Sequence, residues 1–311
     1  MNAARATGSD AGAAVGGAKP IAGQFRFFRA HVVSSRRLGP TLVRITFGGE
    51  QLASFASGGR DQSFSLFLPR PGQAAPLIPA DADEGWFQRW RSQPEEERAV
   101  MRSYTIRSQR RGSAEVDVDF ALHGAGPGGP AGAAGPASRW AARAAPGDQV
   151  VLLGPAVADN RSVRFQPPAG TDWILLAADE TALPAVGGIL EWLPAGSRVK
   201  AWIEVPYSED IQDLPSAADA EIVWLVRGDR DRTAGEPAGG GPLTGAVRAA
   251  ELPEGAPYAW IAGESAMVRA LRRHVVGERG LDRASVEFSG YWRRGASEEQ
   301  LRAEAQAPDA G

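Results

Sequence analysis

Trp173-Ile174-Leu175-Leu176-Ala177-Ala178-Asp179-Glu180-Thr181 is the stretch of sequence that decides the fold. It begins with a continuous apolar run, which is typical of a strand buried on both faces of a parallel sheet. The run ends in the polar triplet Asp179-Glu180-Thr181, and a helix is predicted from residue 182 to residue 193, with Pro184 in its first turn. Ligands of parallel sheets bind beyond the carboxyl ends of the strands, so the triplet marks a candidate ligand site.

After this run, predicted strands continue to alternate with helices. A helix over residues 265–278 places Met267, Leu271 and Val275 on one face, and Gly263-Glu264 forms a second polar strand end. The remaining strands are predicted over residues 199–205, 221–226, 258–262 and 285–290, with a Gly-rich loop over 228–241 that we expect to be mobile. This alternation predicts a doubly wound α/β domain with a parallel sheet.

The first half of the chain follows a different pattern, because its predicted strands are short and are separated by Gly and Pro turns. These strands are predicted over residues 25–33, 41–47, 64–68, 100–107, 115–123 and 149–153, with short helices over 84–92 and 136–145. Such spacing favours an antiparallel barrel or sandwich. We therefore expect a β domain followed by an α/β domain, joined near residues 154–170.

One β-type segment in the first half, Arg102-Ser103-Tyr104-Thr105-Ile106-Arg107, has the residue types that a flavin dinucleotide needs. The Arg102 guanidinium can bind a diphosphate in a forked geometry, Tyr104 can lie flat against a ring, and Thr105 adds a hydroxyl. An ordinary strand whose arginine pairs with a carboxylate would have the same composition, so both interpretations stay open on these residues alone.

The helix that begins at Gly135-Pro136-Ala137-Ser138 is a second candidate element of the site. Its first turn presents backbone N–H groups and a hydroxyl at the positive end of the helix dipole, an arrangement that binds a diphosphate. The alternative is a surface helix with a serine near its cap.

Composition excludes several classes of function. The 311 residues, 43% hydrophobic and 23% charged, suffice for two cores, and the net charge of −3 argues against nucleic acid or a stable membrane association. With no cysteine and three scattered histidines, we predict no metal site. Residues 1–22 lack a signal pattern, and no apolar run approaches the roughly 20 residues of a membrane span. We expect a disordered leader over residues 1–22 and a cytoplasmic location.

Six short motifs occur in order between residues 24 and 295: Arg102–Arg107, Asp117–Gly124, Gly135–Ala141, Ala178–Ala185, Ala262–Glu264 and Gly290–Gly295. Together they resemble the siderophore-interacting proteins, FAD-dependent ferric-siderophore reductases that use NAD(P)H and have a fold of the ferredoxin–NADP reductase type. The resemblance implies an antiparallel FAD-binding β-barrel over residues 23–155, a parallel-sheet NAD(P)H-binding domain over 170–295, and a tail over 296–311 with helix-forming composition.

The resemblance also implies the roles of particular residues. Arg102, Ser103, Tyr104 and Thr105 would hold the isoalloxazine and its phosphate tail, with Tyr104 and Thr105 at the reacting ring as the catalytic pair. Trp292 would cover a flavin face until nicotinamide enters. The other residues implied to bind FAD or the nucleotide are Asp119, Phe120, His123, Ala137, Ser138, Asp179, Thr181, Gly263 and Glu264.

The substrate implied is a ferric siderophore, which Arg139, Arg293 and Arg294 could receive as cations. The sequence departs from the family at Ser65, where a lysine is common in relatives, and this leaves the charge of the siderophore open. The basic helical face formed by Arg269, Arg272 and Arg273 either receives the 2′-phosphate of NADPH or is solvated, and we lean towards NADPH.

Two other functions stay open, and we favour a monomer in all cases. One is a general flavin reductase that donates electrons to flavodoxin or ferredoxin. The other is a non-catalytic protein that binds ferric siderophore.

Overall fold

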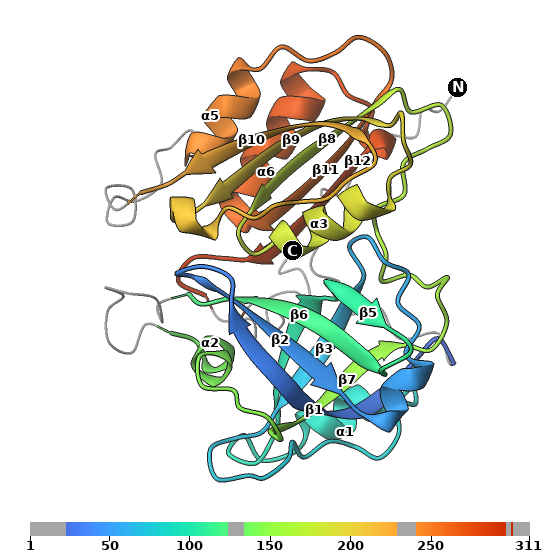
Figure 1. Ribbon diagram of the computed structural model, residues 1–311, viewed down its shortest axis with the longest axis vertical. Coiled ribbons are helices and arrows are strands. Elements are labelled where there is room, and N and C mark those ends of the chain that lie inside the picture. Colours follow the sequence, from blue (N-terminus) through green and yellow to red (C-terminus); the bar gives the residue numbers. More distant parts are fainter. Residues whose placement is uncertain (1–22, 124–133, 229–240, 297–299, 301–311) are drawn as a thin grey trace, which may run out of the picture.

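The computed structural model describes residues 23–123, 134–228 and 241–296 together with residue 300, and these form two domains, one above the other in Figure 1. The predicted leader over residues 1–22 lies outside the described residues, as do most of the predicted loop over 228–241 and of the tail over 296–311. In the described part of the chain, no helix is long and apolar enough to cross a membrane.

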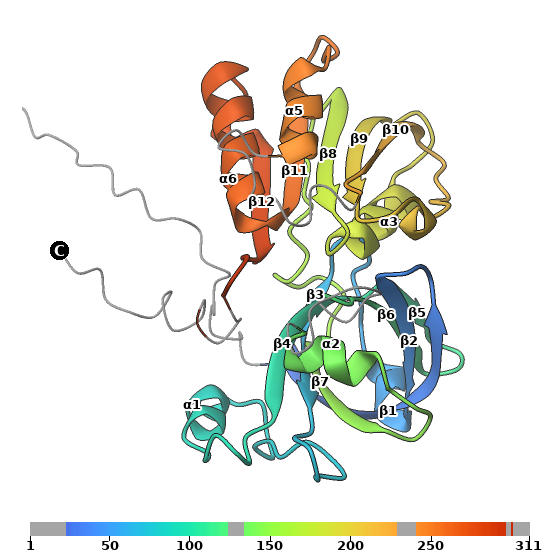
Figure 2. The ribbon, with the colours of Figure 1, turned by 90° about the vertical axis from the view of Figure 1, so that its left-hand side faces the viewer.

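The first domain is a seven-stranded sheet with the order β4-β3-β7-β1-β2-β6-β5, in which every neighbouring pair is antiparallel. Its strands are β1 (Phe25–Arg37), β2 (Leu42–Gly48), β3 (Ser63–Leu68), β4 (Val100–Thr105), β5 (Ser108–Arg110), β6 (Glu115–Ala121) and β7 (Gln149–Pro155). The sheet curls around its own core (Figure 2), which confirms the predicted antiparallel barrel. Strand β4, with the Arg-x-Tyr-Thr motif, lies at one edge.

Alternation of side chains fills the barrel, since Phe28, Phe47 and Phe120 point inward and are fully buried. Three short helices accompany the barrel: η1 (Glu50–Ser54), α1 (Trp86–Arg91) and α2 (Pro136–Ala141). Helix α1 packs Trp86 and Trp90 on the outer face of the sheet. Each helix therefore buries aromatic or aliphatic surface against the barrel.

The second domain is a five-stranded, all-parallel sheet with the order β10-β9-β8-β11-β12. Its elements are β8 (Trp173–Asp179), α3 (Leu183–Trp192), β9 (Arg198–Val205), η2 (Ser208–Asp210), β10 (Asp219–Val226), α5 (Gly241–Ala249), β11 (Pro257–Glu264), α6 (Ser265–Arg273), the π-helical turn η3 (His274–Glu278), η4 (Arg283–Ser285) and β12 (Val286–Trp292). Helix α3 covers one face, and α5 and α6 cover the other (Figure 2). The predicted doubly wound domain is thus confirmed.

The topology of this sheet locates a ligand crevice. The chain runs from β8 outward through β9 to β10 and then returns to place β11 on the other side of β8. Dinucleotides bind where the strand order reverses, outside the carboxyl ends of the strands. The carboxyl ends of β8 and β11 carry Asp179 and Glu264, so these two residues mark the edge of the sheet at which the crevice is expected.

Three contacts fix the domains against each other, and the first two are buried. The Asp61 carboxylate accepts hydrogen bonds from the N–H groups of Arg164 and Phe165 in the connecting segment and from Trp260 Nε1 of β11 (3.0 Å). Asp210 accepts from the N–H and hydroxyl of Thr41 at 2.9 and 2.8 Å.

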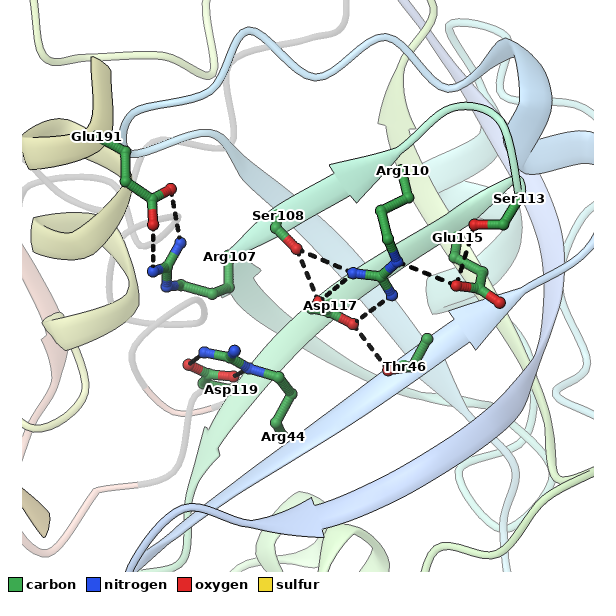
Figure 3. Close-up of polar contacts among 10 residues, drawn as sticks. All are labelled: Arg44, Thr46, Arg107, Ser108, Arg110, Ser113, Glu115, Asp117, Asp119 and Glu191. Carbon is green, nitrogen blue, oxygen red and sulfur yellow. Dashed lines mark hydrogen bonds and ion pairs between the residues drawn. The ribbon is translucent and has the colours of Figure 1, made fainter. Parts of the chain in front are cut away.

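The third contact comes from Arg107, the last residue of the Arg102–Arg107 motif. It forms a two-pronged ion pair with Glu191 of α3, at 3.0 and 2.6 Å (Figure 3). The two arginines of the motif therefore differ in role, because Arg107 joins the domains.

The outer face of the barrel carries a polar network around Asp117 (Figure 3). Arg110 binds both carboxylate oxygens, and the hydroxyls of Thr46 and Ser108 each donate at 2.7 Å. Burial disfavours the charged carboxylate, but the hydrogen bonds from Arg110, Ser108 and Thr46 outweigh it and lower the pKa of Asp117 to about 2 from its usual 3.8. The network therefore favours the folded state wherever Asp117 is ionised.

Replacing Asp117 with asparagine should remove a pH-dependent part of the stability. A depressed carboxyl pKa stabilises the fold above the pKa of the unfolded chain, near 4, and this stabilisation is lost as the pH falls through about 2. We expect the variant to be about 1–2 kcal/mol less stable at neutral pH. Urea unfolding across the acid range should show the difference shrinking towards pH 2, and a constant difference would contradict this account.

Candidate functional site

The first group of candidate residues lies on the edge strand β4. The Arg102 side chain donates from Nη1 to its neighbour's carbonyl, Met101 O, at 2.8 Å and is half-buried, whereas Ser103 is exposed. The Tyr104 ring packs against Phe120 with 4.4 Å between centroids, and Thr105 is buried. A guanidinium, a hydroxyl and an aromatic ring thus follow one another along a single edge of the barrel.

Helix α2 packs beside this strand and β6. The Trp140 ring stacks on Phe47, tilted by only 17°, and so anchors the helix to the barrel core. The first backbone bond of the helix runs from Arg139 N–H to Gly135 O, and the N–H groups of Ala137 and Ser138 precede it. These two residues, predicted to bind the diphosphate, therefore lie at the start of a helix close to Arg102's strand.

Two polar side chains of α2 form hydrogen bonds within the barrel domain. Ser138 Oγ donates to Ala121 O at 3.3 Å, and Arg139 Nη1 donates to the carbonyl of Ala134. Arg139 is nonetheless exposed, so the rest of its guanidinium faces solvent. Backbone N–H groups, rather than the Ser138 hydroxyl, are the donors that α2 offers.

Two residues of β6, Asp119 and Phe120, remain predicted FAD contacts, and their side chains point to opposite faces of the strand. Phe120 is fully buried in the barrel core, where it supports Tyr104. Asp119 points to the opposite face of the strand, where Arg44 holds both of its oxygens at 2.7 and 2.8 Å (Figure 3). Successive strand residues face opposite sides, so these neighbours cannot line the same surface.

The second group lies at the carboxyl ends of β8 and β11. The Asp179 carboxylate is buried and accepts hydrogen bonds from neutral donors: Thr181 N–H (2.9 Å), Thr181 Oγ1 (2.5 Å), Glu264 N–H (2.7 Å) and Trp292 Nε1 (2.8 Å). Burial, reinforced by the neighbouring Glu180, raises the pKa of Asp179 above its usual value, while the bonds from Thr181 and Trp292 oppose the rise. The Asp179 carboxylate thus links the carboxyl ends of β8, β11 and β12 through hydrogen bonds.

Gly263 makes this arrangement possible. Its φ of +141° is unfavourable for other residues, and a Cβ there would lie 2.5 Å from the Asp179 carboxyl carbon. Glu264 then caps α6, because one of its carboxylate oxygens accepts from Ala266 and Met267 N–H. Both predicted residues therefore lie in the crevice, although the Glu264 side chain is occupied by the helix.

A buried ion-pair chain lies next to Asp179. Arg227 bridges Glu180 at 3.0 Å and Glu204 at 2.7 Å, and Glu204 also accepts from Leu243 N–H at the start of α5. Burial opposes the charge on Arg227, but the two carboxylates outweigh it and raise its pKa. The ion pair between Arg227 and Glu204 was not predicted, because no local sequence pattern indicates that these two residues pair.

Trp292, at the end of β12, connects the crevice to the barrel. Its indole N–H binds Asp179, and its ring faces the His123 imidazole with 4.6 Å between centroids and a 33° tilt. The adjacent Tyr291 phenol lies within reach of the Thr105 side chain of β4. Burial raises the pKa of Tyr291, so this phenol stays protonated.

The structure thus brings most predicted residues into two neighbouring groups. One comprises Arg102, Ser103, Tyr104 and Thr105 with Ala137 and Ser138, and the other comprises His123, Asp179, Thr181, Gly263, Glu264 and Trp292. Tyr291, which was not assigned a role although it lies inside the Gly290–Gly295 motif, joins the two. The donor types of the first group fit FAD, which presents a diphosphate to the arginine and helix N–H groups and a flat ring to the tyrosine.

Fold and site together define a two-domain flavoprotein with the fold of the ferredoxin reductases. The ferredoxin reductase in carbazole 1,9a-dioxygenase shares this fold, with a TM-score of 0.54 at 17% identity over 86% of this chain and 69% of that one.

Sequence comparison identifies the family within this class. The model of the siderophore-interacting FAD-binding domain matches residues 31–159, and that of the siderophore-interacting protein matches residues 171–295. The ferric vibriobactin reductase ViuB of Vibrio cholerae is 32% identical, over 88% of this chain and 91% of that protein. The NADPH-dependent ferric-chelate reductase of Escherichia coli is 27% identical, over 88% and 95%.

Among solved structures, the siderophore-interacting protein SipS from Aeromonas hydrophila has a TM-score of 0.69 and 34% identity, over 90% of this chain and 97% of that one. The chain belongs to the siderophore-interacting protein family. FAD is its cofactor, as the motifs predicted.

Proposed function

We propose that the chain is a flavin-dependent oxidoreductase that takes hydride from NAD(P)H and reduces the iron of a ferric siderophore to iron(II). The observation that carries this proposal is the ring contact between Trp292 of the nucleotide-binding domain and His123 of the barrel domain, with Tyr291 beside Thr105. A flavin site and a nucleotide crevice that meet in this way suit electron transfer between two ligands. Family membership and the two reductase relatives support it.

On the barrel side, the residues of β4 and α2 bind and orient FAD. Arg102 and the N–H groups of Ala137 and Ser138 would neutralise the diphosphate, and Tyr104 would support the ring, with Phe120 behind it. The Thr105 hydroxyl, which lies near Tyr291, would orient the ring rather than transfer a proton. FAD, when bound, supplies the step from two-electron to one-electron chemistry.

On the nucleotide side, the crevice between β8 and β11 would receive the nicotinamide nucleotide. Thr181 and Gly263 line this crevice, and Asp179 fixes the backbone of both strand ends. Of the basic face predicted on α6, Arg272 lies over the Phe288 ring at 4.1 Å, and Arg269 and Arg273 are exposed. NADPH stays our preferred donor, in keeping with the name of the E. coli relative.

The substrate would be a hard-oxygen iron(III) chelate. Such ligands hold iron(III) far better than iron(II), so reduction loosens the complex without any protein ligand to the metal. The predicted cations Arg139 and Arg294 are exposed and Arg293 is half-buried, which leaves charge available for an anionic chelate. Ser65 lies directly opposite Ser103 across β3 and β4, a hydroxyl pair on the same sheet.

An anaerobic iron-release assay tests this function. The protein with FAD is mixed with NADPH or NADH and a ferric siderophore, and a chromogenic iron(II) chelator records the product. We expect iron(II) formation that requires protein, FAD and nucleotide together. Electron transfer to flavodoxin or ferredoxin without iron(II) would favour the general reductase, and siderophore binding without any turnover would favour the carrier.

A further inference from the structure

The Trp292 side chain occupies the crevice in which the nucleotide must bind. Its indole N–H is bonded to Asp179 at the end of β8, and its carbonyl accepts from Ser265 Oγ at 2.8 Å, immediately after β11. These are the two strands whose carboxyl ends form the crevice. A planar ring that binds there competes with the indole for the same place.

The position of Trp292 is built by several other residues. Gly263 leaves the space that the Asp179 carboxylate fills, and Gly290 leaves space for Ser265, whose Oγ lies 2.7 Å from where a Cβ would be. His123 of the barrel domain faces the indole, with 4.6 Å between ring centroids. The Asp179 carboxylate thus holds the Trp292 side chain, and the Ser265 hydroxyl holds its backbone, each in space that a glycine leaves open.

Asp179 is buried, and the groups that donate hydrogen bonds to it within the described residues are all neutral. Burying a carboxylate among neutral donors costs folding free energy. A carboxylate is also the acceptor that binds an indole N–H most strongly, because charge-assisted hydrogen bonds exceed neutral ones. The Asp179–Trp292 hydrogen bond therefore has an effect beyond the fold: it sets how tightly Trp292 is held.

We propose that Asp179 is a positioning residue that acts through Trp292, and that the Asp179–Trp292 hydrogen bond sets the affinity of the crevice for the nicotinamide nucleotide. The inference rests on the proposed function and adds a determinant of nucleotide binding to it. Trp292 must leave Asp179 before a nicotinamide occupies the crevice, so the apparent dissociation constant rises with the population of the bonded state. Asp179 would thus act without touching the nucleotide.

Binding of NADP⁺ and NAD⁺ to the FAD-loaded protein, measured by calorimetry, tests the inference. Trp292→Phe keeps a ring but removes the N–H, and we expect it to tighten binding by about 5- to 10-fold, which is the effect of losing one typical hydrogen bond. Asp179→Asn removes the charged acceptor and should act in the same direction. The double variant should gain little over either single variant, because both remove the same bond.

Trp90→Phe is the matched control. Trp90 also donates its indole N–H, to the carbonyl of Ala99 at 3.2 Å, but it lies on α1 against the outer face of the barrel. It should leave the nucleotide affinity unchanged. General damage to the domain would weaken binding in all variants, whereas the proposed role tightens it in two of them.

A spectroscopic readout is independent of nucleotide and flavin chemistry. The indole ¹H–¹⁵N resonance that disappears in Trp292→Phe identifies Trp292, and Asp179→Asn should shift it and speed its hydrogen exchange. The inference is overturned if Trp292→Phe changes the nucleotide affinity by the same factor in the wild-type protein and in Asp179→Asn. It is also overturned if Asp179→Asn leaves the Trp292 resonance unshifted. If no form binds either nucleotide, the proposed function fails together with it; equal affinities in all forms overturn the inference alone.

Discussion

Arg102→Ala is expected to produce a folded protein that loses most of its FAD during purification. Arg102 is the guanidinium on β4, the strand that packs beside α2, and we assign it to the FAD diphosphate. Hydrogen bonds to charged groups contribute about 1.5–3 kcal/mol each. Losing a forked contact should therefore weaken FAD binding by about 10- to 100-fold. The flavin-to-protein absorbance ratio after gel filtration measures the loss.

Tyr104→Phe is the matched control for this prediction. It lies two residues away on the same strand, keeps the ring that packs on Phe120 and removes only a hydroxyl. We expect near wild-type FAD occupancy and an unchanged circular dichroism spectrum in both variants. Full FAD occupancy in Arg102→Ala would contradict the assignment of the diphosphate site.

Gly263→Ala is expected to abolish most reduction by NAD(P)H while FAD stays bound. The new Cβ would lie 2.5 Å from the Asp179 carboxylate, at a φ of +141° that side chains rarely adopt. The end of β11 must therefore move, and the bond from Glu264 N–H to Asp179 must lengthen or break. A misplacement of about 1 Å can slow catalysis by about 100-fold, which is the size of effect we expect on flavin reduction.

Gly245→Ala in α5 gives the corresponding control, because a Cβ there contacts nothing within 4 Å. It should preserve the rate of flavin reduction and slightly favour the helix. The comparison is made by anaerobic rapid mixing with NADPH at equal FAD occupancy. Unchanged reduction in Gly263→Ala would show that the β11 turn tolerates a side chain and that our description of the crevice is wrong.

Much of the fold was predictable because its signals are local. The unbroken apolar run of β8 and the alternating residues of β2 are patterns that a buried parallel strand and a half-buried antiparallel strand produce by themselves. Helix α5 was missed because its first residue, Gly241, ends a Gly-rich run, and the predicted end of the last strand fell short because Gly290 interrupts β12. The helix predicted to residue 278 ends at Arg273 and continues as a π-helical turn.

The site was predictable in its residue types but less so in its pairings. Arg44 and Asp119 are separated by 75 residues and meet only through the register of β2 and β6, which no local pattern records. That the Phe120 and Asp119 side chains face opposite sides of β6 was predictable from strand alternation alone. Tyr291 and Thr105 come from different domains, so their contact depends on how the domains pack.

Anaerobic rapid-mixing absorbance is the measurement that tests most directly whether this chain moves electrons from a nicotinamide to chelated iron. NADPH or NADH is mixed with the FAD-loaded protein, and a ferric siderophore follows in a second mix. We predict that the nucleotide bleaches the flavin absorbance band and that the ferric siderophore restores it as iron(II) appears. A flavin band that neither nucleotide bleaches, or that the siderophore fails to restore, would contradict the account.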